Sequence, residues 1–280
     1  MRVIVTIFYP ALIISAVGPT PVVESPKLVI VSILTGFLAV TLGFAVAWLL
    51  GPLFGLKIGE GRRSFTFTTG IFNYGYLPVP LVIAFYGQTD GTLAILFIHN
   101  IGVDLAFWSV GVLILQGAFS RKGLYRIINP PFVALVFALL LNYSGIYGSL
   151  PGFVVTFLEY LAAIAIPLGI ILAGCAIGGL LTRNAFQSGW KVVTGACLIR
   201  LGILPVLFIA FVYSFDMPPA LEKVILIQAA MPAGLFPVVV AGFFGVRQDV
   251  AVRVAVSTMI LSVITTPLWL KFAGSVFTFN

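Results

Sequence analysis

The sequence predicts an all-α integral membrane protein made of two inverted repeats of helices. Three observations lead to this fold class: the apolar composition, the placement of charges between apolar runs, and an internal repeat. Of the 280 residues, 61% are hydrophobic and 8% are charged, whereas soluble proteins average roughly 45–50% and about 25%. A soluble chain of this length could not bury so much apolar side chain. The basic excess is therefore no evidence for nucleic-acid binding.

Nine apolar runs between charged or turn-rich breaks are candidates for membrane-spanning helices, each of which needs about 20 residues. The connections are short, so we expect one transmembrane domain, residues 1–280, and no soluble domain. The first run also has the form of a cleaved signal peptide, but its place in the repeat favours a mature helix. The predicted spans are Val3–Gly18, Leu28–Leu50, Ser64–Gly87, Thr92–Gly117, Pro130–Tyr147, Phe153–Leu181, Trp190–Tyr213, Val224–Gly245 and Val250–Phe272.

Basic residues gather on one side of these spans. The loops of that side hold eleven lysines and arginines, and the loops of the other side hold three. Cytoplasmic loops carry the excess of basic residues in membrane proteins. We therefore expect the N-terminus of the given chain to be cytoplasmic and the C-terminus to be outside, in a bacterial inner membrane.

The chain repeats itself at a nearly constant offset. Ile7–Ile14 matches Ile164–Ile171 at an offset of 157, and Leu77–Gly87 matches Leu235–Gly245 at an offset of 158. The offset places the first span on the sixth and the third on the eighth. Each repeat therefore advances by an odd number of spans, which inverts the second copy relative to the first. Inverted repeats are typical of secondary transporters.

The repeat divides the chain at about residue 120, into residues 1–120 and residues 121–280. The fifth span has no partner, because its match would lie before Met1. We expect an ancestral plan of five plus five helices whose first helix is absent here, either by loss or because the start codon lies upstream.

Prolines and glycines interrupt the third and eighth spans near their middle. Proline removes a backbone donor, and freed polar backbone is tolerated at this depth only in protein or beside a wet cavity. Ordinary kinks are the alternative, but the matched positions favour two crossing discontinuous helices. The N-termini of half-helices carry partial positive charge, which suits a carboxylate. The candidate substrate-binding residues are Asn73, Tyr74, Gly75, Tyr76, Pro78, Pro80, Gln228, Pro232, Gly234 and Pro237.

Ionisable side chains within spans are costly and are commonly functional. Asp104 lies halfway along the fourth span, and Arg200 lies halfway along the seventh. Either the two neutralise each other, or Asp104 takes up a coupling proton and Arg200 attracts the substrate. His99 and Asn100 precede Asp104, and Glu159 lies two turns into the sixth span. We treat these three as further candidates, although His99 could be a plain interhelical hydrogen bonder and Glu159 could face an outer vestibule.

Several segments together resemble one known family. They are Arg63–Phe65 leading into Asn73–Leu81, Asn100–Gly111, Ile166–Gly174, Arg200-Leu201 before Pro205, and Met231–Ala241 followed by Val256–Thr258 and Pro267. In this order, over nearly the whole chain, they resemble the auxin efflux carrier family. The resemblance implies a ten-helix inverted-repeat fold, shared with bile acid symporters and sodium/proton antiporters, and organic anions as substrates. The chain departs from the family in lacking the first helix and at Leu235–Pro237, where smaller or polar residues are usual.

The expected function is secondary transport of a small organic anion, in particular a carboxylate, by alternating access with a coupling proton. A sodium-coupled symporter of the bile acid type is one alternative, and a non-transporting membrane sensor or assembly subunit is another. We expect no enzyme, because the sequence has no His-Glu-x-x-His, Gly-x-Ser-x-Gly or paired intramembrane aspartates. We also expect no metal or cofactor. The expected partners are the anion, a proton or sodium ion, and the lipid bilayer, and homodimerisation is left open.

Overall fold

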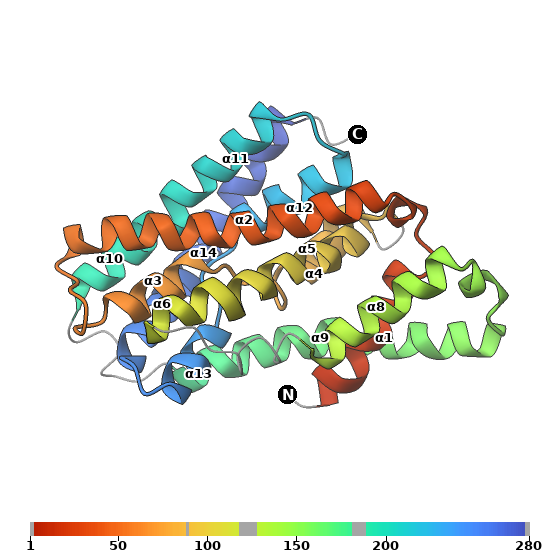
Figure 1. Ribbon diagram of the computed structural model, residues 1–280, viewed down its shortest axis with the longest axis horizontal. Helices are drawn as coiled ribbons and strands as arrows, with labels where there is room; N and C mark the ends of the chain where they lie inside the picture. Colours follow the sequence, from red (N-terminus) through yellow and green to blue (C-terminus); the bar gives the residue numbers. More distant parts are fainter. Residues whose placement is uncertain (1–2, 88–89, 118–127, 181–188, 278–280) are drawn as a thin grey trace.

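The computed structural model describes residues 3–87, 90–117, 128–180 and 189–277. Apart from one isolated β-bridge, all regular structure in these ranges is helical (Figure 1). Helices occupy each of the nine predicted ranges within this part of the chain. The predicted all-α membrane fold is therefore confirmed.

The helices follow one another with short connections, and π-helical turns interrupt or precede several of them. The α-helices are α1 (Tyr9–Val17), α2 (Pro26–Leu50), α3 (Arg62–Gly70), α4 (Pro78–Tyr86), α5 (Thr92–Ala106), α6 (Val112–Gln116), α8 (Pro130–Tyr143), α9 (Gly152–Leu180), α10 (Trp190–Leu198), α11 (Leu204–Ser214), α12 (Pro219–Ala229), α13 (Phe236–Phe243) and α14 (Gln248–Val276). The π-helical turns are Ile4–Phe8, Phe107–Gly111 and Ile199–Ile203.

Five helical segments of the described chain are long and apolar enough to cross a membrane. They are Pro26–Phe54, Thr92–Gln116, Gly152–Gly169, Trp190–Ser214 and Gln248–Val276. Two further apolar helices, Ile4–Val17 and Pro130–Tyr143, are shorter. The remaining two spans, the third and the eighth, are each split into two short helices.

Most predicted ends agree with the helices to within a few residues. The largest difference is the start of the eighth span, which begins at Pro219 rather than at Val224. The charges of Glu222 and Lys223 predicted a loop, but both residues lie in α12. Lys223 is paired with Asp90 at 3.1 Å, and Glu222 lies in the first helical turn, where the partial positive charge of the helix N-terminus favours a carboxylate.

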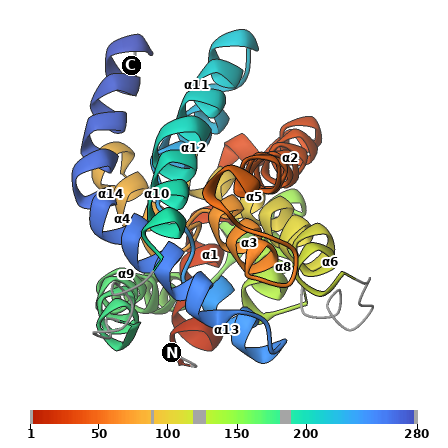
Figure 2. The same cartoon turned by 90° about the vertical axis from the view of Figure 1, so that its left-hand side faces the viewer.

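Glycines allow α2 to pack directly on the backbone of its neighbours. A Cβ atom on Gly102 of α5 would collide with the carbonyl oxygen of Ile33, and one on Gly36 would collide with the carbonyl oxygen of His99. Small residues bring helices this close in membranes, where packing replaces the hydrophobic effect as the force between helices. Figure 2 looks nearly along α2, α5 and α9 and shows that these helices are roughly parallel.

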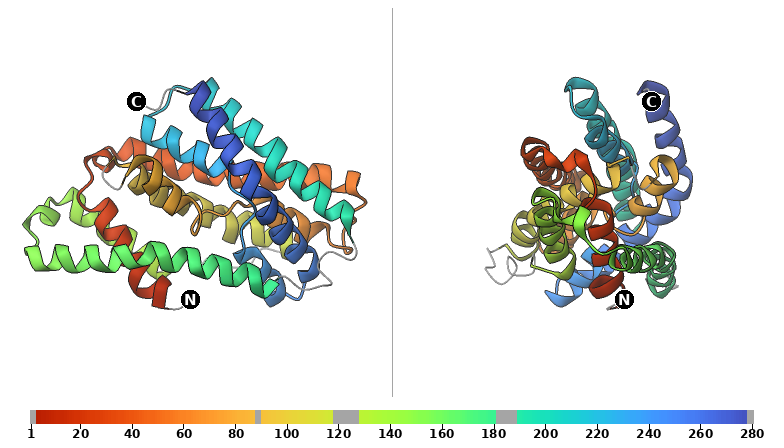
Figure 3. Two further views of the ribbon diagram at one scale, coloured as in Figure 1. Left: turned by 180° about the vertical axis from the view of Figure 1, so that it is seen from behind. Right: turned by 90° about the vertical axis from the view of Figure 1, so that its right-hand side faces the viewer.

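The helices form two bundles. The smaller bundle contains α1, α8 and α9, and the larger bundle contains α2 to α6 and α10 to α14. Figures 1 and 3 show the smaller bundle on one side of the molecule. The bundles touch where α1 and α8 meet α5, and where α9 meets α4 and α14. This boundary positions the candidate site.

Candidate functional site

The third span is broken between Gly70 and Pro78. Helix α3 ends at Gly70, and Ile71 takes an extended backbone conformation with φ −98° and ψ 131°. Pro78 is the first residue of α4. Proline suits the first helical turn, because the N–H that it lacks would have no partner there. The sequence therefore stops one helix and starts the next within eight residues.

The eighth span is broken in the same way. Helix α12 ends at Ala229, and α13 begins at Phe236 with Pro237 in its first turn. Pro78 and Phe236, the first residues of α4 and α13, are 158 positions apart. That separation equals the offset of the sequence repeat.

The two breaks cross and pair through their backbones. The Asn73 N–H donates to the Pro232 carbonyl at 2.7 Å, and the Gly234 N–H donates to the Ile71 carbonyl at 3.1 Å. Phe72 and Ala233 form an antiparallel β-bridge between these bonds. The extended segments thereby satisfy backbone groups that no helix would satisfy, as membrane depth requires.

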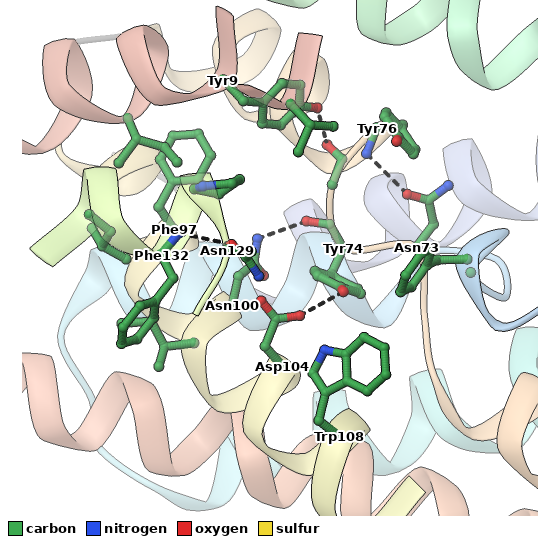
Figure 4. Close-up of a pocket in the computed structure, with 18 of the residues that line it drawn as sticks. Tyr9, Asn73, Tyr74, Tyr76, Phe97, Asn100, Asp104, Trp108, Asn129 and Phe132 are labelled. Carbon is green, nitrogen blue, oxygen red and sulfur yellow. Dashed lines mark hydrogen bonds between the residues drawn. The ribbon is translucent and has the colours of Figure 1, made fainter. Parts of the chain in front are cut away.

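A cavity of about 460 Å³ lies against this crossing, between the two bundles. The larger bundle lines it with both breaks, α5 and the start of α13, and the smaller bundle lines it with α1 and α8. Figure 4 shows the side chains that surround it. The lining residues are Val5, Tyr9, Ile13, Asn73, Tyr74, Gly75, Tyr76, Phe97, Asn100, Ile101, Asp104, Trp108, Asn129, Pro131, Phe132, Leu135, Gly234, Leu235, Phe236 and Pro237.

A chain of hydrogen bonds runs along one wall of the cavity (Figure 4). The Gln228 amide donates to Oδ1 of Asn100 at 2.9 Å, and the Asn100 amide donates to the Tyr74 carbonyl at 2.8 Å. The Tyr74 hydroxyl donates to Oδ1 of Asp104 at 2.7 Å. Asn129, the N-cap of α8, lines the same cavity as Asp104. The chain therefore runs from the crossing to a carboxylate at the boundary with the smaller bundle.

A second polar contact joins the bundles on another side of the cavity. The Tyr9 hydroxyl of α1 donates to the Gly75 carbonyl at 3.3 Å, and its ring packs edge-on against Tyr76 at 6.4 Å between centroids. In the same break, Oδ1 of Asn73 accepts from the Tyr76 N–H at 3.2 Å. Nδ2 of Asn73 has no hydrogen-bond partner in the described part of the chain, although Asn73 is 3% exposed. That nitrogen is buried within the crossing, so Asn73 presents it neither to solvent nor to the cavity.

The sequence is similar to known membrane proteins. A model of the family described as membrane transport protein matches residues 119–270, which is more than half of the chain. The chain belongs to this family. A protein of Methanothermobacter thermautotrophicus called an uncharacterized transporter is 25% identical over 271 residues, which cover 96% of this chain and 86% of that relative. The family predicted from the sequence motifs is confirmed.

This membrane transport protein places eight of the predicted residues on the cavity wall. The other predicted residues of the crossing lie just behind it: Pro78 and Pro80 open α4, Pro232 pairs with Asn73, and Gln228 holds Asn100. The eight lining residues are Asn73, Tyr74, Gly75, Tyr76, Asn100, Asp104, Gly234 and Pro237.

Three of the predicted residues lie away from the cavity of this transporter. Glu159 is exposed on α9. His99 is buried on α5, and neither ring nitrogen has a hydrogen-bond partner among the described residues. Arg200 is buried beside Phe72 and forms no salt bridge with Asp104, which accepts a hydrogen bond from Tyr74 instead. The reading that pairs Arg200 with Asp104 is therefore wrong for this structure.

The sequence did not predict any of the lining residues that the smaller bundle supplies, nor the apolar ones that the larger bundle adds, such as Phe97 and Trp108. Tyr9, Asn129 and Phe132 reach the cavity from α1 and α8. Asn129 had a readable local signal, because an asparagine before Pro130-Pro131 is a typical N-cap. Nothing in the sequence says that this cap faces the broken helices, because that depends on how the two bundles pack.

Proposed function

We propose that the chain is a secondary carrier that moves a small organic anion, in particular a carboxylate, by alternating access. The two bundles would rock against each other around the cavity between them. The single observation that carries this proposal is the cavity at the crossing of the two broken helices. Substrate sites of secondary transporters lie at such breaks near the bilayer midplane.

The choice of an anion rests on the helix N-termini at the cavity. The start of α13 and the start of α8 line the cavity, and α4 begins directly behind it. Helix N-termini carry partial positive charge. All three helices have proline in the first turn, which removes N–H donors. The direct hydrogen bonds to a carboxylate would therefore come from polar side chains on the cavity wall.

Asp104 is the group proposed to carry the coupling proton. It is the only acidic or basic residue among the described residues that line the cavity. It also lies at the boundary between the bundles, bonded to Tyr74 and on the same cavity wall as Asn129. Protonation would remove its negative charge and thereby change both its repulsion of an anion and its contact with α8.

The proposal also includes an architecture of two inverted repeats and the orientation of the chain in the membrane. The antiparallel crossing of the breaks and the 158-residue spacing of α4 and α13 support two inverted repeats. Val5 lies in the π-helical turn that precedes α1, and Asn129 is the N-cap of α8; in the sequence both follow basic residues. With the basic side in the cytoplasm, the cavity belongs to an inward-facing state.

The experiment is a thermal-shift screen of mono- and dicarboxylates on the purified protein, followed by uptake into proteoliposomes. A carboxylate that stabilises the wild-type protein should also be accumulated when a proton gradient is imposed. Stabilisation only by cations or neutral solutes would contradict the anion proposal. Binding without any flux would instead indicate a sensor or an assembly subunit.

A further inference from the structure

The end of α2 and the start of α10 meet at the basic end of the molecule (Figure 1). After α2 the chain forms a 3-10 helix, Gly51–Phe54. The Phe54 ring fills the space beside Gly195 of α10, where an added Cβ would lie 2.6 Å from the ring. Gly55 then turns the chain with φ 74°, and a Cβ there would lie 4.0 Å from Nζ of Lys191. Two segments far apart in the sequence therefore form one surface, which we call the α2–α10 junction.

The α2–α10 junction carries positive charge that no carboxylate of the described chain neutralises. Lys57 and Lys191 are exposed, and none of the three salt bridges among the described residues involves either of them. The two acidic residues described at this end, Glu60 and Asp249, both interact with Arg247 instead. An anion that approaches the junction would therefore meet two lysines.

The helix ends at the junction also favour an anion. Helix α10 begins at Trp190, and its N-terminus carries partial positive charge. The C-terminus of α2 would carry partial negative charge, but Arg62 donates from Nε and Nη2 to the Trp48 carbonyl at 3.2 and 2.8 Å. The arginine therefore offsets the negative end of α2, while the positive end of α10 adds to the charge of the lysines.

Tryptophan and leucine side chains place the junction at the membrane surface. Trp190 is 71% exposed, and the Lys191 ammonium lies 5.8 Å from its ring centre. Tryptophan is enriched where lipid headgroups meet the hydrocarbon. Leu49, Leu53 and Leu198 are exposed on the same two segments. The junction therefore offers a positive head site beside an apolar surface, which is the pattern of an anionic lipid in reverse.

We propose that the α2–α10 junction binds one anionic phospholipid. Its phosphodiester group would lie against Lys191 and the N-terminus of α10, and its acyl chains would cover the three exposed leucines. Basic pockets between transmembrane helices bind anionic lipid headgroups in this way. The lipid would hold the Gly51–Phe54 helix on α10 and thereby stabilise the larger bundle. The site is separate from the cavity between the bundles, so it can be tested whether or not the chain transports a carboxylate.

The test measures the melting temperature of the purified protein in detergent while phosphatidylglycerol, or phosphatidylcholine with the same acyl chains, is added. For the wild type we expect a rise of about 3 °C at a phosphatidylglycerol concentration about ten times the Kd, and a smaller rise with phosphatidylcholine. Lys191→Gln should lose the difference between the two lipids, and Lys191→Arg should keep it. Mass spectrometry of the intact complex should show roughly one phosphatidylglycerol retained per wild-type chain.

Lys271→Gln is the matched control, because Lys271 is an exposed lysine near the other end of α14. It should respond to both lipids as the wild type does. Equal stabilisation of the wild type by the two lipids would overturn the proposal without any variant, and so would an undiminished phosphatidylglycerol effect in Lys191→Gln. The same loss in Lys271→Gln would show an effect of net charge rather than a site, and an equal rise with inorganic phosphate would show a site for a soluble anion. Either result would also overturn the proposal.

Discussion

The Tyr74 hydroxyl lies 2.7 Å from Oδ1 of Asp104 and joins the break in the third span to α5. This bond places a carboxylate of the larger bundle beside Asn129, the cap of α8 in the smaller bundle. One ionisable side chain thus lies where the proposed substrate, the crossing and the boundary between the bundles meet.

Asp104→Asn should remove the pH dependence of uptake and reduce proton-driven accumulation at least about tenfold, because an amide cannot take up the coupling proton. The measurement is carboxylate uptake into proteoliposomes across a range of external pH. Glu159→Gln is the control, since Glu159 is exposed on α9 and should leave the profile unchanged. An unchanged pH profile in Asp104→Asn would remove Asp104 from the coupling mechanism.

Tyr74→Phe deletes only the donor of the 2.7 Å bond. A hydrogen bond to a charged group contributes about 1.5–3 kcal/mol, so the unfolding temperature and the uptake rate should both fall. The same substitution at Tyr160, which is 70% exposed on α9, should change neither. Equal stability of the two variants would show that the Tyr74 bond contributes nothing to the fold.

Asn73→Ala should weaken binding of the stabilising carboxylate by about tenfold, which corresponds to roughly 1.4 kcal/mol. The variant loses a polar side chain of the cavity wall and the bond that Asn73 accepts from the Tyr76 N–H within the break. Asn142→Ala is the contrast, because the Asn142 amide binds the carbonyls at the end of α1, including that of Gly18 at 2.9 Å. Asn142→Ala should lower stability while ligand affinity stays the same. Unchanged ligand affinity in Asn73→Ala, with weakened affinity in Asn142→Ala, would show that the ligand binds elsewhere.

Gly102→Ala should destabilise the larger bundle by about 2 kcal/mol or more, because the new methyl group would meet the Ile33 carbonyl of α2 and rigid backbone cannot yield easily. Gly174→Ala is the matched control on α9, where nothing lies within 4 Å of the added Cβ. Thermal unfolding in detergent measures both variants. Similar melting temperatures would contradict the close contact of α2 with α5.

The sequence predicted the spans well because membrane length and apolar runs are read directly from residue type. It also located both breaks, since Pro78, Pro80 and Pro237 disfavour the interior of a helix and suit the first turn of a new one, where the structure places them. It misplaced the start of α12, because the charges of Glu222 and Lys223 indicate a loop unless their partner Asp90 is known.

The partners of buried groups could not be predicted. Asp104 and Arg200 carry opposite charges, yet they take different neighbours: Asp104 accepts from Tyr74, and Arg200 lies against the rings of Phe72 and Phe208. Tyr9 and Asn129 were missed for the same reason. Their role depends on how the small bundle packs against the large one, and no local pattern records that packing.

The central claim is that a carboxylate enters the cavity between the bundles and is carried across the membrane. The most direct measurement is uptake into proteoliposomes of the radiolabelled carboxylate that most stabilises the wild-type protein, compared with Asn73→Ala and Asn142→Ala. The account predicts saturable uptake by the wild type and by the folded Asn142→Ala protein. For Asn73→Ala it predicts an apparent KM about tenfold higher. Binding without uptake by the wild type, or an unchanged KM in Asn73→Ala, would contradict it.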